Sequence, residues 1–330
     1  MGPFQKKFTL LLERQNHWAQ SVPVIVLLSL LGLTFFTWKT TRDSAHAIAE
    51  AAFSDECREI QKHVESRLTE QEVLLRGAVG LFNSTGEMSH SQWRRYVSAL
   101  ELDRFQPGIL GLGFSVRLKP DEKSANMRKI RAEGFPEYTI KPEGERSVYA
   151  PVIYLEPFNW RNQRALGYDL YSELVRRTAL DYAADQAAAT LSGKITLLQE
   201  TETDKQIGVL MIVPVYRMGA LVDTVENRRA ALLGFVYAPI RMGDFMKNIL
   251  KLLPHGVEFT ILDETSSLPD KKLFSNETGS PTGNKPEFTE THSTEVFQGR
   301  RWSFTCSSLP SFEANASSTK YQIILGINSS

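Results

Sequence analysis

The sequence contains very little cysteine. Cys57 and Cys306 are the two cysteines among 330 residues, and they lie far apart in the chain. Two such residues provide neither the paired spacing of a zinc site nor the bridges of a disulfide-dense secreted scaffold. Two interpretations remain open, a pair of packed or isolated thiols and a single bridge formed outside the cytosol. We expect the thiols.

The chain also lacks an excess of charge of either sign. Its 38 Lys and Arg residues balance 38 Asp and Glu residues. Without a basic excess, no long-range field attracts nucleic acid or another acidic polymer. We therefore expect no nucleic-acid partner. The hydrophobic content of 42% is sufficient for a buried core, and the length suits a membrane segment with one or two domains.

Motifs of the common catalytic sites are absent from the sequence. It contains no G-x-S-x-G, no P-loop and no H-E-x-x-H, and its six histidines show no spacing typical of metal ligands or general bases. Gly108, Gly111 and Gly113 do not have the spacing of a dinucleotide fingerprint. We expect no catalytic residue, no metal site and no cofactor in this chain, and these absences argue against a hydrolase.

One long hydrophobic run stands out, at residues 21–38. About eighteen residues at about 1.5 Å each span roughly 27 Å, close to the ~30 Å hydrocarbon core of a bilayer. We predict a transmembrane helix here. A cleaved signal peptide is the alternative, but the preceding segment of about twenty residues is long and no A-x-A-like cleavage site directly follows the run.

The orientation of this helix depends on a small charge difference. Three basic residues precede the run and two follow closely after it, a slight positive-inside bias. We expect residues 1–20 to be cytosolic and everything after Lys39 to lie outside. The chain then has one membrane-spanning segment.

Residues 41–82 show a helical pattern. Forty residues at about 1.5 Å each make a rod of roughly 60 Å, long for an ordinary domain. We expect a stalk helix that pairs with its twin in a homodimer. A single helix packed along its own domain is the alternative, and both can apply to different parts of its length. The recurring apolar positions are Phe53, Cys57, Ile60, Val64, Leu68, Leu75, Val79 and Phe82.

The stretch at residues 149–216 carries the most informative pattern. An apolar run at residues 150–155 precedes a polar loop. Apolar and small residues then recur near the helical period from Leu174 until about Gly193. Short runs rich in branched aliphatic residues at 195–198 and 207–215 favour strands. The stretch therefore predicts the order strand, loop, helix, strand, strand.

The order of these elements, together with the short sequence motifs in the stretch, resembles the CHASE domain. That domain is the extracytoplasmic sensor region of bacterial histidine kinases and diguanylate cyclases and of plant cytokinin receptors. The resemblance covers about residues 75–240 and depends on the order and spacing of its motifs more than on any one of them. The matching motifs are Tyr149-Ala150-Pro151-Val152-Ile153, Gly167-Tyr168-Asp169, Arg176-Arg177, Ser192-Gly193-Lys194, Gly208-Val209-Leu210 and Val213-Pro214-Val215-Tyr216.

The resemblance implies an α+β fold with two tandem PAS-like units on the long helix. The membrane-distal unit, residues 83–240, would hold a small-molecule ligand, and residues 241–330 would form the membrane-proximal unit. Family members continue into a second transmembrane helix and then a kinase or cyclase. We expect this chain to end before that helix, as the input half of a larger receptor in the inner or plasma membrane, with its sensor periplasmic or extracellular. The alternative is a protein that acts through a partner.

Asp169 is the first choice for a functional residue. In the plant receptors the family's aspartate hydrogen-bonds the purine of cytokinin, and Asp169 lies at the matching position. A carboxylate in a mostly apolar pocket is a strong acceptor for ligand N–H groups. Alternatively, Asp169 or Ser172 simply caps the helix that follows. The loop between Tyr149 and Asp169 departs from the plant pattern, so the ligand is a cytokinin-like purine or another small molecule.

Further ligand-binding positions follow from the resemblance. Each of them also has an ordinary interpretation as strand core. Arg176 and Arg177 have two interpretations, contact with an anionic ligand and a solvated helix face on which they pair with neighbouring carboxylates, and we expect the solvated face. The positions that the resemblance adds to the cavity are Tyr149, Tyr168, Thr196, Leu197, Val213, Val215 and Gly234.

Two functions from different classes remain. The first is an extracytoplasmic small-molecule sensor that passes a shift to its stalk helix. The second is an envelope protein with a structural or partner-binding role, whose PAS-like units bind no small ligand. Mutation of Asp169 distinguishes them.

The remaining segments have simpler patterns. We expect helices at residues 91–102, with Ser91 as cap, at 121–133 and at 243–253, and an exposed loop at 223–229. Residues 263–290 predict a loop or a pair of hairpins. The expected strands are residues 109–118, 138–141, 230–238, 257–262, 294–297, 302–306 and 321–327.

Overall fold

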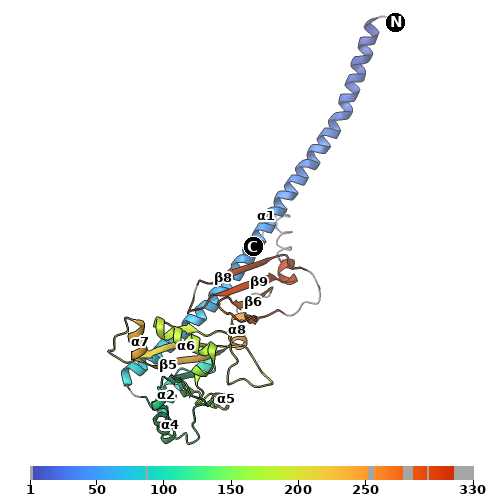
Figure 1. Ribbon diagram of the computed structural model, residues 1–330. Coiled ribbons are helices and arrows are strands. Elements are labelled where there is room, and N and C mark those ends of the chain that lie inside the picture. The colour runs from blue at the N-terminus through green and yellow to red at the C-terminus, as the bar shows by residue number, and fades with distance from the viewer. Residues whose placement is uncertain (1–2, 87, 252–255, 278–284, 296, 316–330) are drawn as a thin grey trace. The chain divides into compact units, whose positions relative to one another are not determined.

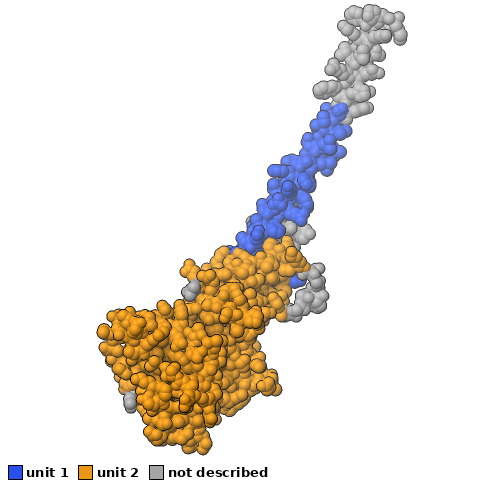
Figure 2. All heavy atoms as spheres, viewed as in Figure 1, with its two compact units in different colours: residues 1–55, 310–330 blue, residues 56–309 orange. Residues whose placement is uncertain are grey.

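The computed structural model describes residues 3–86, 88–251, 256–277, 285–295 and 297–315. By their contacts, residues 1–55 with 310–330 form a smaller compact unit and residues 56–309 a larger one (Figure 2). The predicted α+β class is confirmed, because a long apolar helix is accompanied by two antiparallel sheets with further helices. The PAS-like arrangement and the domain boundaries stay predictions.

A single helix, α1 (Pro3–Thr85), contains both the predicted membrane segment and the predicted stalk. No glycine or proline separates the two at residues 39–40, so the helix continues. Its large apolar side chains between Val22 and Trp38 are about half exposed or more. The hydroxyl of Thr34 donates to the carbonyl of Leu30 at 2.8 Å, so this polar group is satisfied within the helix.

The part of α1 in the larger unit has one buried stripe. The spacing of three or four residues keeps these positions on one side of the helix. Of the positions predicted in this part, Val79 differs, because it is only partly buried while Ala78 is buried. The stripe therefore buries α1 against its own unit, at least on this side. Its fully or nearly fully buried residues are Cys57, Ile60, Val64, Leu68, Gln71, Leu75, Ala78 and Phe82.

The larger unit contains a five-stranded antiparallel sheet (Figure 1). Its spatial order is β2-β1-β5-β4-β3. The longest pair is β4 with β5, which runs from Gly208 opposite Arg241 to Tyr216 opposite Leu232. The strands are β1 (Leu112–Val116), β2 (Val152–Glu156), β3 (Thr190–Leu191), β4 (Gly208–Tyr216) and β5 (Leu232–Arg241).

One face of this sheet packs against α6 (Leu174–Gln186), and we call it the α6 face. Ile212 of β4 and Tyr237 of β5 are paired in register and share a buried cluster with Leu180 of α6. Because side chains alternate along a strand, every second residue of β4 and β5 points to this cluster.

The opposite face packs against α1 and α2 (His90–Ala99), and we call it the α1 face. The ring of Phe82 on α1 lies 4.2 Å, centroid to centroid, from that of Phe114 on β1. The ring of Trp93 on α2 lies 5.5 Å from that of Phe82 and is tilted by 48° relative to it, and its indole N–H donates to the carbonyl of Leu112 at 3.1 Å. The sheet therefore packs directly against α1 on this face.

A second sheet follows the helix α8 (Met242–Leu250), which begins directly after β5. It is antiparallel, with the order β7-β6-β9-β8. The centre of this sheet is apolar, because Phe259, Ile261, Phe304 and Cys306 are almost completely buried. Its strands are β6 (Val257–Asp263), β7 (Lys272–Ser275), β8 (Thr289–Ser293) and β9 (Trp302–Ser308).

Several local predictions are wrong. Residues 138–141 and 195–198 make only isolated bridges, Lys141 to Tyr168 and Ile195 to Gly208. The strand expected at 294–297 lies earlier, in β8, while the strand expected at 321–327 is outside the described residues. The expected loop at 223–229 contains a helix, α7 (Val225–Ala231). The hydroxyl of Thr224 caps α7 by accepting from the amide of Asn227.

The cap of α2 also differs from the prediction. Ser89, not Ser91, accepts from the amide of Gln92, and the Gln92 side chain accepts from the Ser89 amide, so the two form a capping box. The α6 helix ends at Gln186, earlier than expected, because Ala187 adopts a left-handed conformation. The short helices are α3 (Leu102–Phe105), η1 (Pro120–Glu122), α4 (Lys123–Ala132), α5 (Trp160–Gln163) and η2 (Leu170–Ser172).

Candidate functional site

Asp169 lies just before η2, beside the core of the α6 face, and its side chain is fully buried. Its Oδ1 accepts two backbone hydrogen bonds, from Ala150 at 2.7 Å and from Tyr171 at 3.0 Å. The second bond caps the short η2, whereas the side chain of Glu173 caps α6, the helix that Asp169 or Ser172 was expected to cap in the alternative interpretation. The first ties the loop to the segment that enters β2. Two backbone amides of the protein therefore already donate to Oδ1.

The other carboxylate oxygen of Asp169 is in a different situation. Oδ2 is buried and accepts no hydrogen bond from the described residues. The nearest cation is Arg146, whose Nη1 lies 3.4 Å away. Burial raises the pKa of Asp169, while the two backbone hydrogen bonds and the charges of Arg146 and Lys123 lower it without reversing the shift. Oδ2 thus forms an ion pair with Arg146 but accepts no hydrogen bond from the described residues, which leaves it acceptor capacity for a ligand.

Tyr149 and Tyr138 belong to the surroundings of Asp169. The buried Tyr149 hydroxyl accepts from the Arg146 amide and donates to the Gly144 carbonyl, both at 3.0 Å. Lys123 Nζ lies 4.8 Å from the centre of its ring. Burial, followed by the charge of Asp169, raises the pKa of Tyr138. Tyr149 therefore contacts the two cationic residues near Asp169, Arg146 and Lys123.

Arg176 connects two other predicted site residues, Tyr168 and Thr196. Its guanidinium lies over the ring of Tyr168, 5.4 Å from the centroid, and donates to the carbonyl of Thr196 at 2.7 Å. The placement of Arg176 on a solvated helix face is wrong, because its side chain is 7% exposed. The predicted ion pair with a neighbouring carboxylate is present, with Glu173 at 3.2 Å.

The buried hydroxyl of Tyr237 is a further polar group on the α6 face. It has no hydrogen-bond partner among the described residues. Burial raises the pKa of Tyr237, and the charge of Arg176 acts in the opposite direction. Leu197, a predicted site residue, is buried in the same cluster. Sequence reasoning did not select Tyr237, because a tyrosine in an apolar strand looks like ordinary core.

The remaining predicted residues, Val213, Val215 and Gly234, do not join this group. Val213 and Val215 alternate with Ile212, which faces α6, so they point to the α1 face. Gly234 is paired with Val215 and shares its face. A single cavity on one face of the sheet can therefore contain only part of the predicted set. Asp169, Tyr168 and Leu197 lie on the α6 side.

Thr196 is exposed and lines an open cavity of about 570 Å³. This cavity lies between the segment that precedes β4 and the loop between β6 and β7. Asp169 does not line it. The lining residues are Lys194, Ile195, Thr196, Lys205, Gln206, Ile207, Leu268, Pro269 and Asp270.

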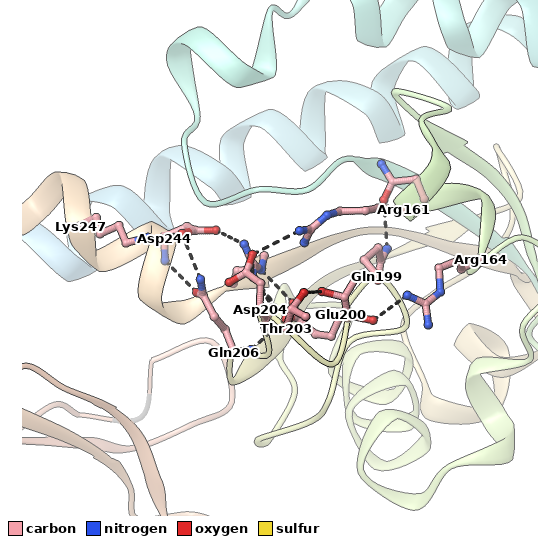
Figure 3. A network of polar contacts seen from close by, with 12 residues as sticks. Arg161, Arg164, Gln199, Glu200, Thr203, Asp204, Gln206, Asp244 and Lys247 are labelled. Atoms are coloured by element: carbon pink, nitrogen blue, oxygen red, sulfur yellow. Dashed lines mark hydrogen bonds and ion pairs between the residues drawn. The ribbon is translucent and has the colours of Figure 1, made fainter.

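A buried polar network at the end of β5 was not predicted from the sequence. Arg241, 6% exposed, donates from Nε to Glu200 at 2.8 Å. It also pairs with Asp244 at the start of α8 and with Asp204. Figure 3 shows Glu200, Asp204 and Asp244 together in this network. Gln206 extends it, because its side-chain N–H donates to the carboxylate of Asp244 and its side-chain oxygen accepts from the Asp244 backbone amide.

The only sequence signal for this network is weak. An arginine directly after the apolar run of β5 has to find a partner if it is buried, and the stretch from Glu200 to Asp204 is rich in carboxylates. The two positions are 41 residues apart, so neither suggests the other. Within the described residues, no group of three or more His, Cys, Asp and Glu side chains is placed to hold a metal ion.

Comparison with known proteins gives a consistent result. The CHASE domain family matches residues 86–274, more than half of the chain. The chain is similar to the hybrid signal transduction histidine kinase A of Dictyostelium discoideum, with 31% identity over 98 residues. That alignment covers 28% of this chain and 4% of the relative. The described part of the chain contains one helix, α1, that is long and apolar enough to cross a membrane.

Proposed function

This chain belongs to the CHASE domain family, and we propose that it is the small-molecule sensor of a membrane receptor. The CHASE domain is a sensory, non-catalytic domain that lies outside the cytoplasm. The histidine kinase among its relatives supports a kinase as the output of the complete receptor, and a diguanylate cyclase is the other output that the family uses. Both outputs would require chain beyond the sensor.

The observation that carries the proposal is Asp169 Oδ2, which is buried, lies 3.4 Å from Nη1 of Arg146 and accepts no hydrogen bond from the described residues. A buried carboxylate oxygen without a hydrogen-bond donor costs free energy, on the order of 1–3 kcal/mol or more for a charged group. A ligand that presents an N–H or O–H group to Oδ2 recovers this cost. The proposed site lies on the α6 side of the sheet and includes Tyr168 and Leu197, with Arg176 and Tyr237 as additional polar groups.

Signalling would follow from the way the five-stranded sheet contacts α1. A ligand that binds two arrangements of the sheet with different affinity shifts the balance between them. A coupling of about 1–3 kcal/mol changes an output equilibrium 5- to 150-fold. Through the contact between Phe114 and Phe82, the sheet packs directly against α1. We propose that α1 transmits the shift.

The placement of the chain in the membrane belongs to the same proposal. The exposed apolar side chains at residues 22–38 support a membrane-spanning segment. Residues 1–20 would be cytosolic, and the sheets would lie outside. The distal and proximal units at residues 83–240 and 241–330, and a homodimer through the helix at residues 41–82, complete this arrangement.

The test uses the full chain in detergent and measures its thermal midpoint against purines, cytokinins, amino acids and carboxylic acids. Asp169→Asn is the decisive variant, because its amide oxygen can still accept from Ala150 and Tyr171 while its NH2 group replaces Oδ2. Asp169→Ala removes both functions, and Asp121→Asn, at an exposed position, is the matched control. A ligand at 100 times its Kd stabilises the parent by about 2.7 kcal/mol.

We expect a ligand that raises the midpoint of the parent and the Asp121→Asn control by several degrees and leaves Asp169→Asn unchanged. A ligand that stabilises Asp169→Asn equally well would place the binding site elsewhere. If no compound acts, and Asp169→Ala loses about 1 kcal/mol while Asp169→Asn loses almost nothing, the residue is only a cap. The capping bond to Tyr171 is the observation that favours this second reading, an envelope protein that binds a partner.

A further inference from the structure

The two cysteines of the chain meet inside the larger unit. Cys57 lies on α1 and Cys306 on β9, 249 positions further along the sequence. Both side chains are completely buried, and both are free thiols in this structure. The side chain of Cys57 is in contact with that of Cys306. Just before β9, the side-chain amide of Gln298 donates to the carbonyl of Leu68 at 3.5 Å and to the carboxylate of Glu72 at 2.9 Å, so this part of the chain lies directly against α1. No other cysteine exists in the chain with which either of them could pair.

The elements that carry them support this contact from both sides. Cys57 is part of the buried stripe of α1, one turn before Ile60. Cys306 alternates with Thr305 and Ser307, which are partly exposed, and shares its side of β9 with the buried Phe304. The thiols are therefore held by a helix stripe and a strand face that are both buried over several residues.

We infer that Cys57 and Cys306 form a disulfide bond in the mature protein, which ties α1 to β9. The geometry does not depend on the proposed function. The source of the oxidant does, because disulfides persist outside the cytosol and are rare within it. Closing an S–S bond of about 2.05 Å requires the two sulfur atoms to approach further by side-chain rotation.

The oxidation balances with a protein disulfide as co-reactant. The thiolate of one cysteine attacks the disulfide of an envelope thiol oxidase, which forms a mixed disulfide and releases one thiolate of the oxidase. The second cysteine attacks its partner's sulfur in that mixed disulfide, and the S–S bond of this chain forms. Two electrons pass to the oxidase, which becomes a dithiol, and both protons of the original thiols are transferred with them.

The environment sets when this reaction occurs. The hydrogen bond to Cys306, followed by burial, raises the pKa of Cys57, and the charges of Glu290 and Glu56 act in the same direction. A buried thiol with a raised pKa supplies little thiolate, so the folded unit resists attack. The bond therefore forms during folding, while the thiols are accessible. Once formed, it encloses β1 to β8 and the first part of β9 in one covalent loop, because residues 57–306 contain these segments of the described chain.

The experiment uses the full chain, produced in the membrane of a bacterial host and trapped by acid quenching without reductant. After denaturation, a maleimide coupled to a 5 kDa polyethylene glycol counts free thiols by their gel shift. A parallel sample of purified, reduced chain is loosened in urea and refolded in oxidised and reduced glutathione. Cys57→Ser and Cys306→Ser are the matched variants, since each leaves one thiol.

We expect no shift for the parent from cells and two shifts after reduction. Each serine variant gives one shift with or without reductant. Reduction lowers the thermal midpoint of the parent by on the order of 10 °C and leaves that of Cys306→Ser unchanged. Two free thiols in the parent from cells would overturn the inference. The glutathione sample then identifies the cause. If no bond forms in glutathione, the two thiols are not placed to form a disulfide. If a bond does form there, the chain in cells lies in a reducing compartment, which contradicts the proposed location.

Discussion

Arg241 and Glu200 form a buried ion pair, with Nε of the arginine 2.8 Å from Oε1 of the glutamate and side chains only 6% and 3% exposed. The pair joins the end of β5 to the loop that leads into β4. Arg241 also contacts Asp244 at the start of α8, the helix that leads to the second sheet. One guanidinium thus connects three segments at the point where the chain passes from the first sheet to the second.

Removing this guanidinium leaves Glu200 buried without its cation. We expect Arg241→Met to lower the free energy of unfolding by about 3–5 kcal/mol, the usual cost of breaking a buried pair from one side. Urea unfolding of the full chain in detergent measures this. Arg161→Met is the matched control, because Arg161 pairs with Asp204 at 3.2 Å in the exposed part of the same network, and we expect a far smaller loss.

The double variant Arg241→Met with Glu200→Leu gives a further check. Because it removes both charges, it should lose less stability than the sum of the two single variants. Additive losses would show that the two side chains act independently, contrary to the geometry.

The raised pKa of Asp169 predicts a pH dependence of stability. The unfolded chain ionises this residue near its ordinary pKa of about 3.9, whereas burial raises the pKa in the folded chain. The contribution of Asp169 to stability is therefore fully present below the unfolded pKa and is lost as the pH rises through the folded pKa. The side chain of Asp169→Asn does not ionise and so acquires no buried charge as the pH rises. The stability of this variant should therefore fall less over this range.

Urea midpoints of both proteins at pH 4, 5, 6 and 7 give the measurement. The difference in stability between the parent and Asp169→Asn should shift in favour of the variant as the pH rises. Asp121→Asn, at an exposed site, provides the baseline. A difference that shifts in favour of the parent would mean that Arg146, 3.4 Å from Oδ2, outweighs burial.

Local patterns in the sequence predicted the elements whose periodicity is set by burial. The stripe from Cys57 to Phe82 follows from the helical period, and β4 and β5 follow from runs of branched residues. Short segments failed. Residues 195–198 have strand propensity but only one bridge, Ile195 to Gly208, and the carbonyl of Thr196 accepts from the side chain of Arg176. Strand propensity is a local property and does not account for a hydrogen bond between residues far apart in the sequence.

The candidate site was predictable only in part, for a related reason. Asp169 follows from the resemblance to a family, and the structure shows its buried carboxylate. Val213 and Val215 are in the predicted strand, but which face they occupy depends on the register between β4 and β5. The ion pair of Arg241 and Glu200 depends on folding of the whole sheet, since 41 residues separate the two.

Gly234 tests whether a predicted site residue serves packing instead of ligand binding. A Cβ added at this position would overlap the carbonyl oxygen of Ser115 and lie 2.8 Å from Cζ of Phe114. Since the Ser115 oxygen belongs to the neighbouring strand β1, it cannot move without disturbing the pairing of β1 with β5. We expect Gly234→Ala to cost about 1–3 kcal/mol of stability, the usual effect of overpacking.

Gly80 provides the contrasting substitution. It lies on the exposed side of α1, and a Cβ added there would meet nothing within 4 Å. Gly80→Ala should therefore stabilise the protein by about 0.5–1 kcal/mol, because alanine loses less backbone entropy in a helix. Urea unfolding of both variants, together with the ligand titration, separates the two roles of Gly234. A Gly234→Ala protein as stable as the parent that no longer responds to the ligand would show that this glycine contacts the ligand, and that the close approach of β1 is not what requires it.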